Sequence, residues 1–347
     1  MIEFLYEYGL FLAKTVTIVL GVVAVIAFAV NAIRQREFME ERPRIKIKNL
    51  NDTYDNMERQ LKSFLMSDSE WKRFLKQEKK DEKAKAKKQK KEPEDPKKRV
   101  FVLDFEGDVG ANQVDSLRKE ITAILTNATE KDEVVVRLES GGGTMVGYGL
   151  GASQLQRVRE RKIPLTVSVD KVAASGGYMM ACVADKLVAA PFAIVGSIGV
   201  IAEMPNVNRL LKKLDIDYEQ ITAGEFKRTL TVFGENTPKG REKLTEELNE
   251  MHGLFKTHVV QHRPELDIEK LATGEIWFGS QAVDLKLVDE LITSDDWLLG
   301  KRKDADILKI EYHEPTPWQE KIALPFTKLF RDSLGAIWKR LQDLRLQ

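Results

Sequence analysis

A serine followed by two glycines, at the end of an apolar strand pattern, is the feature of this sequence that most strongly suggests chemistry. The segment reads Val172-Ala-Ala-Ser175-Gly-Gly-Tyr178. The β-branched run Leu165–Val169 before it predicts a buried strand, and the small apolar residues at 178–184 predict a helix. Ser175 therefore falls where a strand turns sharply into a helix. Such a turn exposes a hydroxyl and directs backbone N–H groups at a bound group. A packing turn without chemistry is the alternative.

A second glycine-rich segment, Ser140-Gly-Gly-Gly-Thr144, connects a predicted strand at 133–138 to a predicted helix at 145–161. In parallel sheets ligands bind beyond the carboxyl ends of the strands, where both glycine-rich segments fall. One interpretation is an oxyanion hole, built from a glycine N–H of this segment and the N–H of Gly176. A phosphate cradle is another, although the chain lacks the G-x-x-x-x-G-K-[ST] motif, and a simple turn is the third.

A nucleophilic serine needs a base, and the sequence offers few. The chain contains four histidines, namely His252, His258, His262 and His313. The first three lie on a charged helical pattern at 237–263 and are predicted to be surface residues, which disfavours a Ser-His-Asp triad. A lysine removed from water is the alternative base. Lys227, which follows a predicted strand at 218–222 and a glycine, is one candidate among several.

The elements around these residues alternate between strand and helix patterns. Strands are predicted at 100–105, 133–138 and 164–169, and helices at 113–126 and 145–161. This alternation predicts a parallel α/β sheet within a folded domain at 100–312.

The N-terminal region predicts a membrane anchor, placed at 1–34. Residues 15–33 carry no charge, and their length suits a bilayer core, while no signal-peptide cleavage site follows. We therefore expect an uncleaved transmembrane helix that contacts membrane lipid, with a buried core helix as the alternative. The flanking basic residues are Arg34, Arg36, Arg42, Arg44, Lys46 and Lys48. They all follow the helix, and only the α-amino group and Lys14 precede it, which favours a cytoplasmic location for the rest of the chain. A periplasmic location is the alternative, because long domains can be translocated despite flanking charge.

Two further segments flank the predicted domain. Residues 35–99 are expected to form a helical spacer, with an amphipathic helix followed by the lysine-rich run 79–91, which cannot build a core. A solvated linker or contact with anionic lipid both fit this run. Residues 313–347 predict an amphipathic helix with basic and aromatic residues, which packs either on protein or on a membrane surface.

Composition excludes several classes of protein. The net charge of +1 gives no argument for nucleic-acid binding, and 43% apolar residues suffice for a sizeable core. The single cysteine, Cys182, rules out an intramolecular disulfide and is predicted to be a small core residue. No ligand set with recognisable metal spacing occurs, so neither a metal nor another cofactor is expected.

Several motifs, taken in order, resemble the S49 serine peptidases of the signal peptide peptidase A group. The similarity extends over about residues 100–293. Its motifs are Arg137-Leu-Glu-Ser-Gly-Gly-Gly143, Ala173-Ala-Ser-Gly-Gly-Tyr178, Val195-Gly-Ser-Ile-Gly-Val200, Gly224-Glu-Phe-Lys227, and Gly274-Glu-Ile-Trp-Phe-Gly-Ser-Gln-Ala282 followed by Leu287-Val-Asp-Glu290. One departure stands out, because the family usually has Asn-Ser-Pro-Gly-Gly where this chain has Glu139-Ser-Gly-Gly-Gly143.

The resemblance implies a ClpP/crotonase-like α/β fold and a Ser–Lys dyad. By this resemblance Ser175 is the nucleophile and Lys227 the general base and acid. The implied oxyanion donors are Gly143 and Gly176, with Gly142 as the near alternative. Ser197 is implied to orient the lysine ammonium. The neutral amine is the active base, so activity is expected to rise towards alkaline pH.

The resemblance also predicts the setting in which this chemistry takes place. It implies a single-pass protein of the bacterial inner membrane that hydrolyses peptides or unfolded polypeptides as an endopeptidase. It further implies a homo-oligomer with sites near subunit interfaces. An acyl-CoA hydratase or isomerase on the same fold is the alternative enzyme, and a catalytically impaired scaffold is the alternative without chemistry.

Overall fold

The computed structural model describes residues 9–12, 14–23, 25, 44–91 and 97–314, without the side chains at 82 and 84–91. These fall into two compact units, Ile45–Glu311 on one hand and Met1–Arg44 with Tyr312–Gln347 on the other, and each is considered by itself. Of the predicted transmembrane helix, residues 15–23 and 25 are described and helical, and the remainder lies outside the described residues, as does the predicted helix after residue 314. Within the described ranges, no helix combines the length and the apolar character needed to cross a bilayer.

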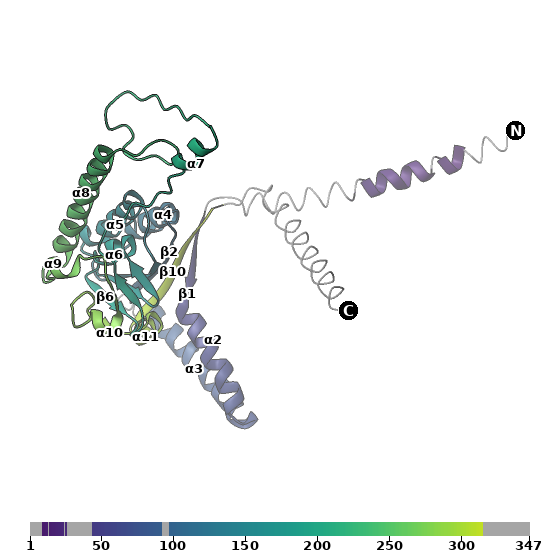
Figure 1. Cartoon of the computed structure of the whole chain (residues 1–347). Coiled ribbons are helices and arrows are strands. Elements are labelled where there is room, and N and C mark those ends of the chain that lie inside the picture. The colour runs from purple at the N-terminus through teal and green to yellow at the C-terminus, as the bar shows by residue number, and fades with distance from the viewer. Residues whose placement is uncertain (1–8, 13, 24, 26–43, 92–96, 315–347) are drawn as a thin grey trace, which may run out of the picture. The chain divides into compact units, whose positions relative to one another are not determined.

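The larger unit is organised around one twisted sheet (Figure 1). In the described chain its strands are β1 (Arg44–Asn49), β2 (Lys98–Gly107), β3 (Glu133–Ser140), β4 (Leu165–Val169), β5 (Val172–Ala174), β6 (Lys186–Ala189), β7 (Ile194–Gly196), β8 (Ile276–Phe278), β9 (Glu290–Leu291) and β10 (Ala305–His313). The main path runs β1-β10-β2-β3-β4-β6-β9, and β5, β7 and β8 form a branch from β3. The pairs from β10 through β2, β3, β4 and β6 to β9 are parallel, as are β3–β5 and β5–β7, whereas β7 and β8 are antiparallel.

Helices cover both faces of this sheet. The helices described in this unit are α2 (Leu50–Leu65), α3 (Asp68–Lys91), α4 (Val114–Leu125), α5 (Met145–Glu160), α6 (Gly176–Ala181), α7 (Asn208–Lys213), α8 (Pro238–His262), α9 (Ile268–Leu271), α10 (Gly279–Ala282) and α11 (Ser294–Lys301). The main core lies between the sheet and α4, α5, α6 and α8, while a smaller core joins the opposite face to the start of α2 and to α11. Parallel strands buried on both faces read as continuous apolar runs, which explains the Val- and Leu-rich sequences of β2, β3 and β4.

The predicted α/β alternation is confirmed. Strands β2, β3 and β4 and helices α4 and α5 each form where the patterns predicted them. The prediction of a strand at 218–222 is wrong, because this segment is irregular and exposed. Its alternating residues resemble a strand, but within the described chain no sheet strand pairs with it. Cys182 is fully buried, as predicted, and burial raises the pKa of its thiol to about 12.

The region expected to be a spacer contributes to the sheet. Strand β1 lies at its edge beside β10. The residue that fixes this edge is Asn51, whose side-chain amide donates to the carbonyls of Arg302 and Ala305, both at 3.0 Å. Its oxygen accepts the N–H of Ile307 at 2.7 Å. After α2 the chain continues into the long basic helix α3 (Figure 1).

Candidate active site

Ser175 occupies a strained turn between β5 and α6. Its backbone has φ 52° and ψ −119°, a conformation that residues other than glycine rarely adopt. The turn is held at both ends, since the Ser175 N–H donates to the carbonyl of Gly196 at 2.8 Å and the Ser175 carbonyl accepts the N–H of Met179 at 3.0 Å. Strain of this kind persists only where the surrounding structure enforces it, and here it presents a half-exposed hydroxyl at the carboxyl end of the sheet.

The glycine-rich segment after β3 lies directly against Ser175. Gly142 has φ +92°, and a Cβ built on it would lie 2.7 Å from the Ser175 Cβ and 2.8 Å from the Gly176 nitrogen. No side chain fits at this position, so the sequence needs glycine there. The structure thus brings together the two loops that the sequence placed at the same edge of the sheet.

The backbone N–H groups of the glycines around Ser175 differ in whether they already donate a hydrogen bond. The Gly142 N–H donates to the Ser140 Oγ at 3.0 Å and is engaged. By contrast, the N–H groups of Gly143 and Gly176 donate no hydrogen bond to any part of the chain that the structure describes. Among the three glycines named as oxyanion candidates, Gly143 and Gly176 are therefore the pair with free donors.

Strand register places Ser197 beside Ser175. Strands β5 and β7 pair so that Ala174 faces Gly196, and Ser175 and Ser197 are the next residues on each strand. Ser197 also has a positive φ of 51°. Its N–H donates to the carbonyl of Glu275 at 2.6 Å, which fixes the turn.

Lys227 is not joined to Ser175 within the chain. It lies on an irregular segment that we call the arm, residues 206–237, which contains α7 and precedes α8. Figure 1 shows the arm extending from the start of α8, beyond the body that carries α5 and α6. The Lys227 side chain is exposed, and over the described residues no hydrogen bond or ion pair links it to Ser175. This structure therefore shows no hydrogen bond between the two side chains of the predicted dyad.

The prediction that the three α8 histidines are surface residues is wrong, because each is half-buried. The Nε2 of His252 lies 3.3 Å from the carbonyl of Ile198, and the Nε2 of His258 lies 2.9 Å from that of Met179. Burial lowers the pKa of His258, and burial with the charges of His258 and Arg159 lowers the pKa of His262 to about 4. His252 and His258 thus fasten α8 to the loop after β7 and to α6, and over the described chain no hydrogen bond joins any of the three histidines to Ser175. The many charged residues around them concealed this role.

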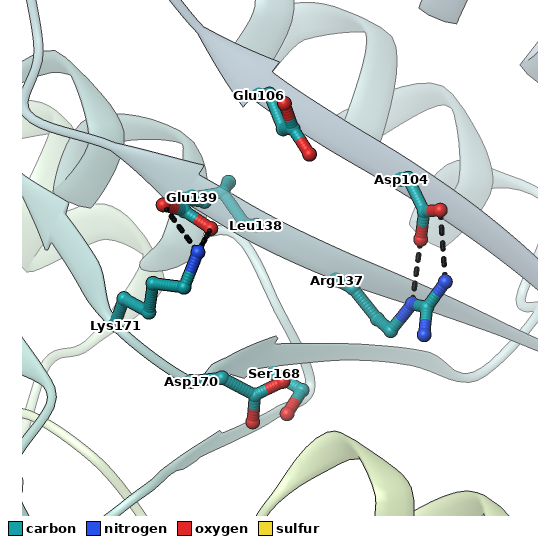
Figure 2. A pocket seen from close by; sticks show the side chains of 8 residues that line it. All are labelled: Asp104, Glu106, Arg137, Leu138, Glu139, Ser168, Asp170 and Lys171. Atoms are coloured by element: carbon teal, nitrogen blue, oxygen red, sulfur yellow. Dashed lines mark hydrogen bonds and ion pairs between the residues drawn. The ribbon is translucent and has the colours of Figure 1, made fainter.

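The charge of Glu139 is compensated. Its carboxylate pairs with the Lys171 ammonium at 2.8 Å, and both residues line a cavity of about 280 Å³ (Figure 2). The cavity is lined by Asp104, Glu106, Arg137, Leu138, Glu139, Ser168, Asp170 and Lys171. Arg137 donates two hydrogen bonds to Asp104, at 2.5 and 2.8 Å. No group of three metal-ligating side chains occurs among the residues that the structure describes.

Sequence comparison now assigns this site to a family. The family models "Peptidase family S49 N-terminal" and "Peptidase family S49" match residues 3–155 and 157–308. The chain is 51% identical over 320 residues to "Probable protease SohB" of Haemophilus influenzae, with 89% of each chain covered. The chain belongs to peptidase family S49.

A further curated relative and two solved structures are also similar to the chain, the structures at low identity. The probable protease SohB of Buchnera aphidicola from Acyrthosiphon pisum is 49% identical, with 89% of this chain and 90% of the relative covered. A substrate-peptide complex of the 1510-N membrane-bound stomatin-specific protease is 15% identical, with a TM-score of 0.40, and covers 67% of this chain and 99% of its own. ClpP1 of Listeria monocytogenes has a TM-score of 0.39 at 14% identity, with 58% of this chain and 94% of its own covered. The S49 assignment rests on the sequence matches, and it favours a serine peptidase over an acyl-CoA enzyme.

Sequence reasoning missed two residues that shape this site. Ser140 was part of a recognised motif, but its contact with Gly142 was not foreseen. Tyr148 lies within a helix that was predicted correctly, yet it was assigned no role. Its side chain is fully buried beneath Gly176, and a helical pattern alone does not distinguish such a residue from an ordinary core aromatic.

Proposed function

We propose that this S49 serine peptidase is a membrane-anchored endopeptidase that uses Ser175 as its nucleophile. The strained turn at Ser175, with the unpaired N–H groups of Gly143 and Gly176 beside it, carries this proposal. Together they supply a hydroxyl at a sheet end and two donors for a developing negative charge, the requirements of acyl transfer.

The reaction proceeds through an acyl-enzyme. A neutral lysine amine takes the Ser175 proton as the hydroxyl oxygen bonds to the scissile carbonyl carbon. The tetrahedral oxyanion accepts hydrogen bonds from Gly143 and Gly176, each worth roughly 3 kcal/mol in such sites. The lysine ammonium then protonates the leaving amine as the C–N bond breaks, and water hydrolyses the resulting ester.

We infer that Lys227 serves a neighbouring copy of the chain. Lysine is a base only where its surroundings exclude water, and an exposed arm does not provide that. The arm also exposes large apolar side chains, namely Leu210, Leu214, Ile216, Tyr218, Ile221, Phe226 and Phe233. Packing of this surface against a second copy would bury these residues and bring the amine to the partner's serine. Ser197, at the end of β7, is placed to orient that ammonium.

The membrane anchor remains the assignment that best fits the uncharged segment at 15–33. The basic residues that follow it favour a catalytic domain on the cytoplasmic side of the inner membrane. The substrate proposed for this domain is a peptide or an unfolded polypeptide, which reaches the nucleophile as an extended chain.

The test is hydrolysis of casein and of a fluorogenic peptide by the full chain in detergent, beside Ser175→Ala and Lys227→Ala. We expect both variants to fall at least about 1,000-fold, to background, while retaining the oligomer size of the parent. A fluorophosphonate probe should label the parent at Ser175 and leave Ser175→Ala unlabelled. Retention of peptide cleavage by either variant would refute the dyad.

A further inference from the structure

One buried tyrosine packs against Gly176 and also contacts Ser140, which binds the N–H of Gly142 in the glycine-rich loop. Tyr148 lies near the start of α5 and is fully buried. Its ring lies beneath Gly176, because a Cβ built on that glycine would lie 2.4 Å from the Tyr148 Cγ. The ring is held in turn by Phe105 in an edge-to-face contact, with 6.4 Å between centroids. The Tyr148 ring therefore fixes the position of the Gly176 backbone that packs on it.

The phenol of the same residue reaches the glycine loop through Ser140. The Tyr148 hydroxyl donates to the carbonyl of Asp108 at 2.7 Å and lies 2.5 Å from the Ser140 Oγ. Since the phenol proton is committed to Asp108, Ser140 is the donor in the second contact. The Ser140 Oγ accepts the Gly142 N–H at 3.0 Å, and a second acceptor for its proton, the Gly107 carbonyl, lies at 3.2 Å.

These bonds form a chain with one direction, from the Gly142 N–H through Ser140 and Tyr148 to the Asp108 carbonyl. Hydrogen bonds aligned in this way strengthen each other in a buried setting. Burial raises the pKa of the Tyr148 phenol, so it remains a donor at neutral pH. The turn at 108–109 also holds the other end of the glycine-rich loop at 140–144, because the carbonyl of Val109 accepts the N–H of Thr144 at 2.9 Å.

We propose that Tyr148 and Ser140 are positioning residues that set the separation of the two oxyanion donors, Gly143 and Gly176. Neither side chain touches substrate in this role. Tyr148 supports Gly176 with its ring and restrains the loop of Gly143 with its hydroxyl, through Ser140. The inference rests on the proposed function, since it presupposes that these two N–H groups bind the oxyanion.

The test is steady-state peptide hydrolysis by the full chain in detergent, with Tyr148→Phe and Ser140→Ala. Tyr148→Phe keeps the ring and removes the middle of the chain of hydrogen bonds. We expect kcat to fall about 10- to 100-fold with KM within about twofold, because the interaction lost acts on the transition state. The kcat of the double variant should be no more than about threefold below that of the less active single variant, because both substitutions interrupt the same chain of hydrogen bonds.

Tyr178→Phe is the matched control. Tyr178 is also fully buried, and its hydroxyl donates to the carbonyl of Leu287 at 2.9 Å, away from the glycine loop. Loss of the Tyr178 hydroxyl should lower the melting temperature about as much as loss of the Tyr148 hydroxyl. It should leave kcat within about twofold of the parent.

Three outcomes would overturn the inference: an unchanged kcat in Tyr148→Phe, an equal loss of kcat in Tyr178→Phe, or a loss confined to KM. If Tyr148→Phe does not fold, Ser140→Ala is judged by the same criteria. Ser175→Ala, measured alongside, keeps the two proposals separate. If Ser175→Ala retains activity, the proposed function itself is refuted. If Ser175→Ala is inactive but Tyr148→Phe has the kcat of the parent, only the positioning role is refuted.

Discussion

At the scale of single residues, the site depends on a position that has no room for a side chain. Gly142 has a positive φ and lies so close to Ser175 and Gly176 that a methyl group would displace one of them. Gly141, the preceding residue, has open space where a methyl group would lie and no positive φ. Two adjacent glycines of the same loop therefore differ sharply in what they tolerate.

We predict that Gly142→Ala lowers kcat/KM at least about 100-fold, because the displaced backbone no longer presents its donors to the oxyanion. Gly141→Ala should stay within about threefold of the parent. Peptide hydrolysis by the two purified variants, with circular dichroism to confirm folding, provides the measurement. Equal losses in both variants would mean that general loop flexibility, and not the contact with Ser175, is what matters.

At the scale of elements, buried charges align the strands at the end of the sheet away from Ser175. Asp132 is 3% exposed and accepts hydrogen bonds from the Arg99 side chain at 3.0 and 2.6 Å, and from the Thr129 N–H at 2.8 Å. Burial alone would raise the pKa of Asp132, but these hydrogen bonds outweigh it and lower the pKa from 3.8 to about 2. The ionised carboxylate thus ties the start of β2 to the start of β3.

We predict that Asp132→Asn lowers the free energy of unfolding by about 2 kcal/mol at pH 7. The folded pKa lies below the unfolded one, so this stabilisation is present above about pH 4 and is lost as the pH falls towards 2. Urea unfolding at pH 7 and pH 3 should show the difference between variant and parent shrinking at the lower pH. Asp115→Asn, at an exposed helix pair with Arg118, should change stability by less than about 0.5 kcal/mol. A difference in unfolding free energy between Asp132→Asn and the parent that stays constant across pH would contradict the role given to the Asp132–Arg99 ion pair.

The elements that the sequence predicted well are those whose stability is decided locally or by simple burial. Continuous apolar runs identify β2, β3 and β4 because both faces of these strands are covered. Strand β1 was missed although its cations alternate with isoleucines, because it is a short edge strand without a continuous apolar run and four of its six residues are exposed. The strand predicted at 218–222 has the residue pattern of a strand but does not form one, because no neighbouring strand in the described chain pairs with it.

For the site, the place of Ser175 and its neighbouring glycines at a strand-to-helix turn could be predicted, because such a turn has a recognisable pattern of small residues. Their support could not. The contact of Tyr148 with Ser140 and Asp108 joins three segments whose proximity is set by how α5 packs on the turn after β2. Sequence spacing carries no record of such a contact, since any buried aromatic at that helix position gives the same apolar pattern.

At the scale of the whole molecule, the arm carries the proposal that the catalytic site is shared between copies. Its base is closed by hydrogen bonds from Asn206 to the carbonyls of Thr231 and Gly234, at 2.8 and 3.0 Å, and from Asn208 to that of Phe233 at 2.8 Å. The arm is thus a built projection, and it exposes apolar side chains such as Ile221, 96% of whose surface is accessible. A surface of this kind is typical of an interface.

We predict that inactive variants complement each other. Subunits with Ser175→Ala still carry an intact Lys227, and subunits with Lys227→Ala still carry an intact Ser175. If the dyad forms between copies, random assembly of equal amounts pairs an intact serine with an intact lysine at about one quarter of the sites. Co-expression of the two variants should therefore restore about a quarter of the parent's peptide hydrolysis.

The control is co-expression of Ser175→Ala with the double variant that lacks both residues, which offers no intact serine and should stay at background. Each preparation must first be shown to contain mixed oligomers, for example by purification through a tag on one variant only. Background activity in such mixed oligomers would place Lys227 and Ser175 of one copy in the same site. The arm would then have to fold back over its own α6, and its exposed apolar residues would pack against the chain that carries them. Restored activity would instead make the oligomer part of the catalytic machinery, because one copy holds the strained serine and its oxyanion donors while the next supplies the base.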